Sequence, residues 1–217
     1  MPPHTRHLTL QPDLFCPAQA NPVHLVDEGL DVTYWAQYFP HDLASAFFKT
    51  LLDETAWQQP ALRMYGRSVQ TPRLTAWYGD AHASYTYSGL LNRPSPWTPT
   101  LARLRDLAGA ATGARYNAVL LNLYRDGADH VSWHSDDEAT LGHAPTIASI
   151  SLGAERRFCL RPKAPGAPSQ QYDIALSHGS LLCMRGQTQS LWEHAVRKEL
   201  RVKEPRINLT FRKIDGV

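Results

Sequence analysis

The feature that most constrains the fold is a series of short β-type segments, which make up most of the chain after residue 70. Each segment is rich in β-branched and aromatic residues and is bounded by Gly, Pro or Asp. The predicted strands are residues 74–78, 84–87, 116–124, 146–151, 157–160, 172–175, 180–184 and 207–212. Short strands separated by turns indicate paired antiparallel sheets, not a parallel sheet with crossover helices. We therefore expect a mainly β protein with flanking helices and a double-sheet jelly roll as its core.

Two segments show helical periodicity instead. From Asp42, the segment DLASAFFKTLLDETAW places its apolar residues on one stripe, and Asp42 is the expected N-cap. A second helix is predicted from Thr98 and Pro99, a capping residue followed by proline, to about Gly113. We expect both helices to support the sheets and to carry no functional site.

Length and composition indicate one globular domain. The chain has 217 residues, of which 43% are hydrophobic and 19% charged. Residues 1–25 are rich in Pro and His and lack apolar periodicity, so we expect an extended or poorly ordered lead-in there. Residues 26–217 are predicted to form a single domain, in which a helical part with a lid (26–115) precedes the β core (116–217).

The cellular location is predicted from what the sequence lacks. No apolar run approaches the roughly 18–20 residues of a membrane helix, and the N-terminus has no signal-peptide core. Three widely spaced cysteines fit no disulfide framework. We expect a cytoplasmic monomer with no membrane partner, and nucleoid or nuclear association is left open.

The formal net charge of +2 hides an uneven distribution. Residues 156–213 carry twelve Lys or Arg against four Asp or Glu, whereas the rest of the chain carries ten against sixteen. Such asymmetry favours an anionic partner, nucleic acid among them, although a solvated basic face explains it equally well.

A candidate metal site is marked by His134 and Asp136. On a strand, side chains two residues apart share a face, so both would reach one ion. An isolated His-x-Asp pair is usually a surface hydrogen bond, but His194 follows between two predicted strands. Two His and one carboxylate are the facial triad of non-haem Fe(II) oxygenases, which leaves coordination positions open. A closed zinc site would want a fourth ligand, and none is suitably spaced.

The predicted strand at residues 206–212 alternates completely between polar and apolar residues. Its polar side carries Arg206, Asn208, Thr210 and Arg212, and its other side carries Ile207, Leu209 and Phe211. If the polar side faces solvent, the strand is an ordinary edge. If it faces the interior of a barrel, it forms a dicarboxylate pocket, because arginine binds carboxylates in bidentate geometry. Asn122 and Tyr124, on one face of another strand, would complete that pocket.

Taken together, these motifs resemble those of the AlkB-type Fe(II)/2-oxoglutarate-dependent dioxygenases, which oxidatively demethylate alkylated nucleic acid bases. The matching segments are PRLTAWYG (72–79), YTYS (85–88), NLYRDG (122–127), WHSDDE (133–138), IASISLG (147–153), HGSLL (178–182), His194 and EPRINLTFR (204–212). The match runs in order from residue 60 to 213 and does not extend to residues 1–60. It implies a double-stranded β-helix core, a jelly roll of the cupin type.

The resemblance also implies a set of cofactors and the residues that hold them. Fe(II) would be bound by His134, Asp136 and His194, and oxygen would take the last open position. The residues implied for 2-oxoglutarate are Asn122, Tyr124, Arg206, Asn208, Thr210 and Arg212, with Arg206 on the distal carboxylate and Arg212 near the metal. The implied reaction is DNA repair by oxidative demethylation of N-alkylated bases of the 1-methyladenine and 3-methylcytosine type. It would convert 2-oxoglutarate to succinate and CO2 and release formaldehyde.

A base must leave its stack to reach a buried metal, so the substrate site should offer aromatic faces and a polar contact. The residues that the resemblance assigns to the substrate are Met64, Tyr65, Arg73, Trp77, Tyr85, Tyr87 and Glu138. Tyr87 would stack on the base, and the carboxylate of Glu138 suits a cationic lesion. Met64 and Tyr65 fall where some family members carry a wedge that intercalates in duplex DNA. Without the resemblance, the tyrosines would be ordinary cross-strand packing and Glu138 part of a solvated turn.

Two alternatives stay open at this point. The first is an oxygenase of the same fold that acts on a protein or a small molecule. The second is a nucleic-acid-binding module with a degenerate metal site. The second is disfavoured because the triad and both arginines are present. The first is disfavoured by the tyrosine pair, Glu138 and the basic last third of the chain, none of which such a substrate requires. DNA is favoured as the partner, and RNA is left open.

Overall fold

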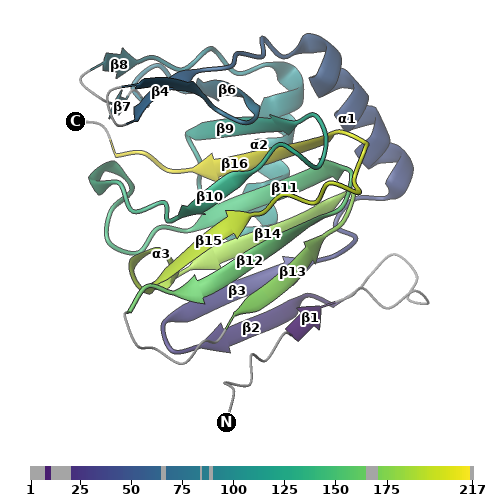
Figure 1. Ribbon diagram of the computed structural model, residues 1–217, viewed down its shortest axis with the longest axis vertical. Coiled ribbons are helices and arrows are strands. Elements are labelled where there is room, and N and C mark those ends of the chain that lie inside the picture. The colour runs from purple at the N-terminus through teal and green to yellow at the C-terminus, as the bar shows by residue number, and fades with distance from the viewer. Residues whose placement is uncertain are drawn as a thin grey trace.

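The computed structural model describes residues 8–10, 21–64, 67–83, 85–87, 90–164 and 171–215. At residues 8–10, 62–64, 67–68, 85–87 and 90–92 it describes the backbone alone. In these ranges the chain forms two large sheets, one of which is covered by two helices (Figure 1).

The larger sheet has seven strands in the order β2-β3-β14-β11-β16-β9-β6. Its strands are β2 (Val23–Asp27), β3 (Leu30–Trp35), β14 (Ser180–Arg185), β11 (Ile147–Gly153), β16 (Arg206–Arg212), β9 (Ala118–Tyr124) and β6 (Leu74–Gly79). All neighbours in this sheet are antiparallel. The last strand, β16, therefore lies in the middle of the sheet, between β11 and β9.

The second sheet has five strands in the order β1-β13-β12-β15-β10. They are β1 (Leu8–Leu10), β13 (Tyr172–Leu176), β12 (Arg156–Pro162), β15 (Trp192–Val196) and β10 (Val131–His134). Two hairpins stand apart from the sheets: β4 (Ala61–Met64) with β5 (Arg67–Gln70), and β7 (Tyr85–Tyr87) with β8 (Leu90–Asn92). The prediction of a mainly β protein with a jelly-roll core and flanking helices is confirmed.

Three α-helices and one 3-10 turn complete the described part of the chain: α1 (His41–Glu54), α2 (Pro99–Thr112), the single turn α3 (Thr188–Leu191) and the 3-10 turn at Ala139–Leu141. The second predicted helix is confirmed, since the Thr98 side chain accepts a hydrogen bond from the Leu101 amide and Gly113 ends α2 at φ 71°. The prediction of Asp42 as the N-cap of the first helix is wrong. Pro40 occupies the cap position in extended conformation, so Asp42 lies in the first turn, where its charge still favours the helix dipole.

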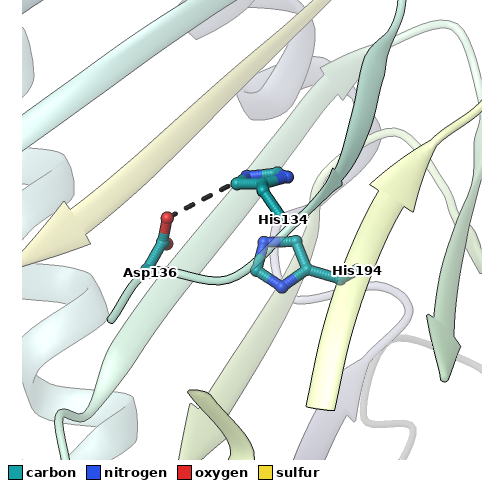
Figure 2. Close-up of side chains that lie close together, drawn as sticks. All are labelled: His134, Asp136 and His194. Carbon is teal, nitrogen blue, oxygen red and sulfur yellow. Dashed lines mark ion pairs between the residues drawn. The ribbon is translucent and has the colours of Figure 1, made fainter. Parts of the chain in front are cut away.

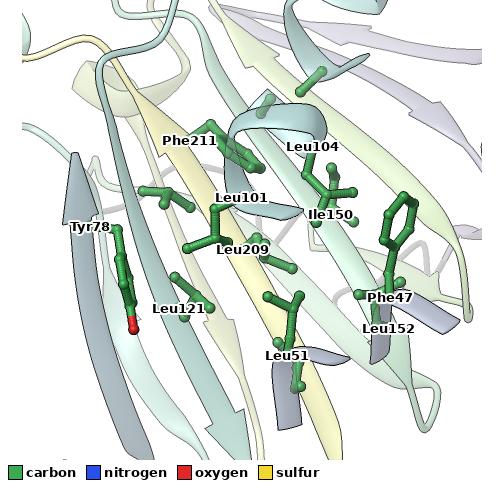
Figure 3. Packing of buried hydrophobic residues seen from close by; sticks show 14 of the residues in the cluster. Phe47, Leu51, Tyr78, Leu101, Leu104, Leu121, Ile150, Leu152, Leu209 and Phe211 are labelled. Carbon is green, nitrogen blue, oxygen red and sulfur yellow. The ribbon is translucent and has the colours of Figure 1, made fainter. Parts of the chain in front are cut away.

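The main hydrophobic core lies between the two long helices and the seven-stranded sheet. Phe47 and Leu51 of α1 and Leu101 of α2 pack against the sheet, where they meet side chains such as Ile150 and Leu209 (Figure 3). The alternate side chains of the sheet point the other way, toward the five-stranded sheet. A second apolar cluster there fills part of the space between the sheets.

Strands from the first 115 residues contribute directly to the β core. β2 spans residue 25, where we placed the end of the lead-in, and β1 pairs in parallel with β13. β3 was not predicted, although Leu30, Val32 and Tyr34 alternate inward and are each at most 2% exposed. No helix in the described ranges is long and apolar enough to cross a membrane.

Candidate metal and cosubstrate site

Pairing between two strands brings together two histidines that are far apart in sequence. β10 and β15 are antiparallel, and their register sets His134 directly opposite His194. Their ring centroids are 4.3 Å apart. Residues that face each other across two strands have neighbouring Cβ atoms, so sheet formation alone builds this half of the site.

Asp136 reaches the two histidines from a loop and not from a strand. β10 ends at His134, so the prediction that His134 and Asp136 share one strand face is wrong. The chain turns after His134 and directs the Asp136 carboxylate back toward both rings (Figure 2). One potential ligand atom from each of the three residues lies within 4.8 Å of the others. The triad itself is therefore assembled as expected, by a different local geometry.

Hydrogen bonding and burial prepare the two imidazoles as ligands. Nδ1 of His134 donates to the Ser132 carbonyl oxygen at 2.9 Å, which leaves Nε2 to face Asp136 at 4.0 Å. Burial, and then the neighbouring His134, lower the pKa of His194 to about 3 against the opposing effect of Asp136. His194 is therefore neutral at physiological pH, which is the form that binds a metal.

Asp136 is held in its charged form. Burial alone would raise the pKa of its carboxyl, but the charge of Arg212, together with His194 and His134, outweighs burial and lowers it. Nη2 of Arg212 donates to Oδ1 of Asp136 at 2.8 Å. The site therefore offers two imidazoles and one carboxylate, a donor set that suits Fe(II) and leaves room for further ligands.

The polar face of β16 lies in the interior of the molecule, which decides between the two alternatives that its alternation left open. Asn208 stands between Ser151 of β11 and Asn122 of β9 in the strand register. Its Nδ2 donates to Ser149 Oγ at 2.9 Å, and Nη2 of Arg206 donates to Ser151 Oγ at the same distance. The apolar residues of β16 all belong to the core beneath the helices.

Arg206 is the most deeply buried charge on this face, with a side chain 0% exposed. Its guanidinium carbon lies 5.1 Å from the ring centroid of Tyr124. Nε and Nη1 find no hydrogen-bond acceptor among the described residues, and burial lowers its pKa. A buried guanidinium with two unused donors is costly unless an anion binds it, so this environment fits a carboxylate ligand.

One cavity connects the metal triad to the polar face of β16. It is lined by all three ligand residues and by every residue predicted for 2-oxoglutarate except Arg206, whose guanidinium adjoins the lining residue Tyr124. Arg73 also lines the cavity, and its Nε donates to Asn122 Oδ1 at 2.7 Å. The geometry therefore matches a metal centre with an adjoining pocket for a dicarboxylate.

Comparison with known proteins agrees with this site. Residues 31–212 match the model of the 2OG-Fe(II) oxygenase superfamily. Human DNA oxidative demethylase ALKBH2 is 41% identical over 199 residues, which cover 88% of this chain and 76% of the relative. Bovine alpha-ketoglutarate-dependent dioxygenase alkB homolog 3 is 44% identical over 178 residues, or 79% of this chain. The chain is an AlkB-type 2OG-Fe(II) oxygenase.

Two further matches extend the comparison. ALKBH2 of Arabidopsis thaliana is 36% identical over 208 residues, which cover 85% of this chain and 66% of that protein. The solved structure of OsALKBH1 superposes with a TM-score of 0.61 at 15% identity, covers 89% of this chain and 100% of its own, and shows the shared fold. The match to the bovine alkB homolog 3 covers only 62% of that relative's length.

The cofactors of this oxygenase are Fe(II), 2-oxoglutarate and O2, and the residues present fit them. His134, Asp136 and His194 would hold the iron. Arg206 would hold the distal carboxylate of 2-oxoglutarate, because its orphaned donors need such an anion. When bound, the iron and the 2-oxoacid supply the oxidising chemistry, while the chain supplies position and exclusion of water.

The residues predicted for the substrate are only partly placed. Tyr85 and Tyr87 lie on β7 and Met64 ends β4, but their side chains, like all of Tyr65, fall outside the described residues. Trp77 pairs with Leu120 across β6 and β9 but packs on a small cluster that includes Leu141 and Ile214, outside the cavity lining. Glu138 is exposed, and its side chain makes no capping bond to the 3-10 turn that follows.

Three residues that shape the site were not predicted. Ser149 and Ser151 accept the hydrogen bonds of Asn208 and Arg206, and their alternation with isoleucine and leucine in IASISLG was a usable signal. Gln189 accepts a hydrogen bond from the Asp136 amide. Nothing in the local sequence marks this glutamine, because its partner is 53 residues away.

Proposed function

We propose that the protein repairs DNA by oxidative demethylation of N-alkylated bases of the 1-methyladenine and 3-methylcytosine type. In this reaction 2-oxoglutarate is converted to succinate and CO2, and the methyl carbon leaves as formaldehyde. The observation that carries the proposal is the single cavity that joins the His134, Asp136 and His194 triad to the polar face of β16. The names of the relatives, DNA oxidative demethylase among them, support the choice of substrate.

The residues of the chain have distinct tasks in this proposal. Arg206 binds the distal carboxylate of the cosubstrate, and Asn122 and Asn208 orient it from the two neighbouring strands. Arg212 fixes the Asp136 carboxylate at 2.8 Å and keeps it anionic. Because these groups are already held by the sheets, little reorganisation is needed when the cosubstrate binds.

Two exposed features among the described residues suit a cationic base on an anionic backbone. The lesions 1-methyladenine and 3-methylcytosine carry a positive charge, and Glu138 presents an exposed carboxylate two residues beyond Asp136. Its oxygen atoms can accept from the exocyclic amine of either base. The connection between β15 and β16 exposes the basic side chains of Arg197, Lys198, Arg201 and Lys203, which suit phosphate contacts.

Mass spectrometry of a methylated oligonucleotide tests the proposal. The protein is incubated with Fe(II), 2-oxoglutarate, oxygen and a single-stranded oligonucleotide that holds one 1-methyladenine or 3-methylcytosine. We expect the oligonucleotide to lose the mass of one CH2 unit, because hydrogen replaces the methyl group, and succinate to form at the same time. If succinate forms and the methyl group stays, the oxygenase assignment stands and the substrate is wrong.

A matched pair of variants identifies the residue behind the lesion preference. Glu138→Gln removes the charge next to the base, and Glu155→Gln removes an exposed charge in the turn between β11 and β12. We expect Glu138→Gln to lower kcat/KM for the cationic lesion about 10-fold, from the loss of one charge-assisted hydrogen bond, and Glu155→Gln to leave it unchanged. Equal effects of both variants would contradict the role of Glu138.

The monomeric state and the cytoplasmic location stay predictions, whereas the sequence predicts no preference between duplex and single strand and leaves RNA open as a substrate. Size-exclusion chromatography with light scattering measures the molar mass in solution and so tests the monomeric state. Parallel reactions on single-stranded DNA, duplex DNA and RNA with the same lesion rank the substrates.

A further inference from the structure

The backbone of the metal loop has a donor that the sheet does not satisfy. β10 ends at His134, so the amide of Asp136 lies beyond the strand ladder. Asp136 is only 4% exposed, and a buried amide N–H needs an acceptor. That acceptor is the side chain of Gln189, whose Oε1 lies 2.9 Å from the Asp136 nitrogen.

The amide group of Gln189 is fixed at both of its ends. The residue is 2% exposed, and its Nε2 donates to Met184 Sδ at 3.2 Å while its oxygen faces Asp136. Sulfur is a weak acceptor and the Asp136 N–H is a strong donor, so the amide is held in one orientation. Met184 itself lines the cavity, which ties this contact to the site.

The short helix that carries Gln189 is anchored as well. Thr188 Oγ1 accepts from the Asp31 amide of β3 at 2.9 Å. On the other side, Nζ of Lys163 donates to the Gln189 carbonyl and to Asp137 Oδ2, each at 2.8 Å. α3 is thus tied to β3, to the end of β12 and to the metal loop, so it is a rigid support for Asp136.

We infer that Gln189 is a positioning residue that sets the metal affinity of the site by holding the peptide of Asp136. Arg212 holds the carboxylate of Asp136 and Gln189 holds its backbone, so the ligand is fixed from both ends. The inference rests on the metal site described above. Partners of metal ligands typically change metal affinity 10- to 100-fold when they are removed.

Metal binding by the full chain tests this inference without turnover. Gln189→Met keeps the length of the side chain and removes its acceptor, and Gln187→Met makes the same change at an exposed neighbour. In a Co(II) titration followed by absorbance, we expect Gln189→Met to raise Kd about 10- to 100-fold. Gln187→Met is expected to match the wild type. Loss of Co(II) binding in the wild type would refute the metal site, whereas equal Kd values in wild type and Gln189→Met would refute the role of Gln189 alone.

A second variant and a second measurement separate positioning from folding. Gln189→Glu retains an acceptor oxygen at the same reach, so we expect it to restore slow hydrogen exchange of the Asp136 amide, which Gln189→Met accelerates. The exchange of amides in β9 and β16 serves as the folding control. If Gln189→Met does not fold, the test uses Gln189→Glu alone. Fast exchange of its Asp136 amide, with the amides of β9 and β16 still protected, would overturn the inference.

Discussion

The central strand β16 buries side chains on both faces of the seven-stranded sheet, and the two faces are stabilised in different ways. On β16, Leu209 and Arg206 are both 0% exposed, and they point to opposite faces. Leu209 packs under α1 and α2 in an apolar cluster, whose packing requires no ligand (Figure 3). Arg206 faces the five-stranded sheet with two of its donors unused among the described residues.

This contrast separates the residues that fold the chain from those that bind its ligands. Burial of apolar surface stabilises the helix-covered face in the absence of any ligand. The opposite face buries charges whose favourable interactions are completed only when the metal and the cosubstrate bind. Substitutions on one face should therefore change stability, and substitutions on the other should change binding and turnover.

The largest effect on activity is expected from the metal ligands and from the arginine of β16 that holds one of them. His134→Ala and Asp136→Ala each remove a metal ligand, and Arg212→Ala removes the partner that holds Asp136. We expect each of the three to abolish demethylation while the far-UV circular dichroism stays that of the wild type. Activity retained in any of the three would show that the site is assigned to the wrong residues.

A truncation on the apolar face should lower the stability of the protein and leave metal binding unchanged. Leu209→Ala removes a fully buried side chain from the cluster under the helices, and such changes cost about 2–5 kcal/mol of unfolding free energy. Urea denaturation measures this loss. The Kd for Co(II) of the folded variant should stay within about twofold of the wild type, because the Leu209 side chain points away from the cavity that its neighbours Asn208 and Thr210 line. A weakened Co(II) affinity would show that the two faces are coupled.

Arg206→Met is expected to change cosubstrate binding without a loss of stability. The hydrogen bonds to a charged carboxylate contribute about 1.5–3 kcal/mol, so KM for 2-oxoglutarate should rise about 10- to 150-fold. The unfolding free energy without cosubstrate should stay equal or rise, because a buried charge with two donors unused among the described residues is replaced by an apolar side chain. A clear decrease in the unfolding free energy would show that Arg206 stabilises the fold even without the cosubstrate.

The smallest effect concerns a titratable group at the edge of the helix-covered face. His178 Nδ1 accepts from the Gly153 amide at 2.8 Å, its Nε2 donates to Ser45 of α1, and His41 lies beside it. Burial, and then the neighbouring His41, lower the pKa of His178 below its usual value. The unfolded state therefore binds the proton more readily, so stability is full above the unfolded pKa and falls as the pH drops through the folded one. Urea midpoints at pH 7 and pH 5 should differ by more in the wild type than in His178→Asn.

Local patterns in the sequence were sufficient to predict the strands with strong polar–apolar alternation and the helix α2, which has clear capping residues at both ends. The alternation in residues 206–212 predicted both faces of β16, and Thr98, Pro99 and Gly113 predicted the bounds of α2. β10 and β15 were not predicted because each is short and carries polar ligands where apolar residues would mark a strand. At the first helix, Pro40 is the cap in place of Asp42, because its carbonyl oxygen accepts the first helical hydrogen bond from the Ala44 amide at 3.0 Å.

The sequence by itself determined the chemistry: two histidines, one aspartate and two arginines in an order that indicates an iron and 2-oxoglutarate site. Only the tertiary structure decided how they meet. His134 faces His194 through strand register, Asp136 reaches them from a loop, and Gln189 holds that loop from 53 residues away. The physical reason is range, since side-chain type and alternation act between neighbours in sequence, whereas register, burial and the acceptor of a lone amide are fixed only when distant segments pack together.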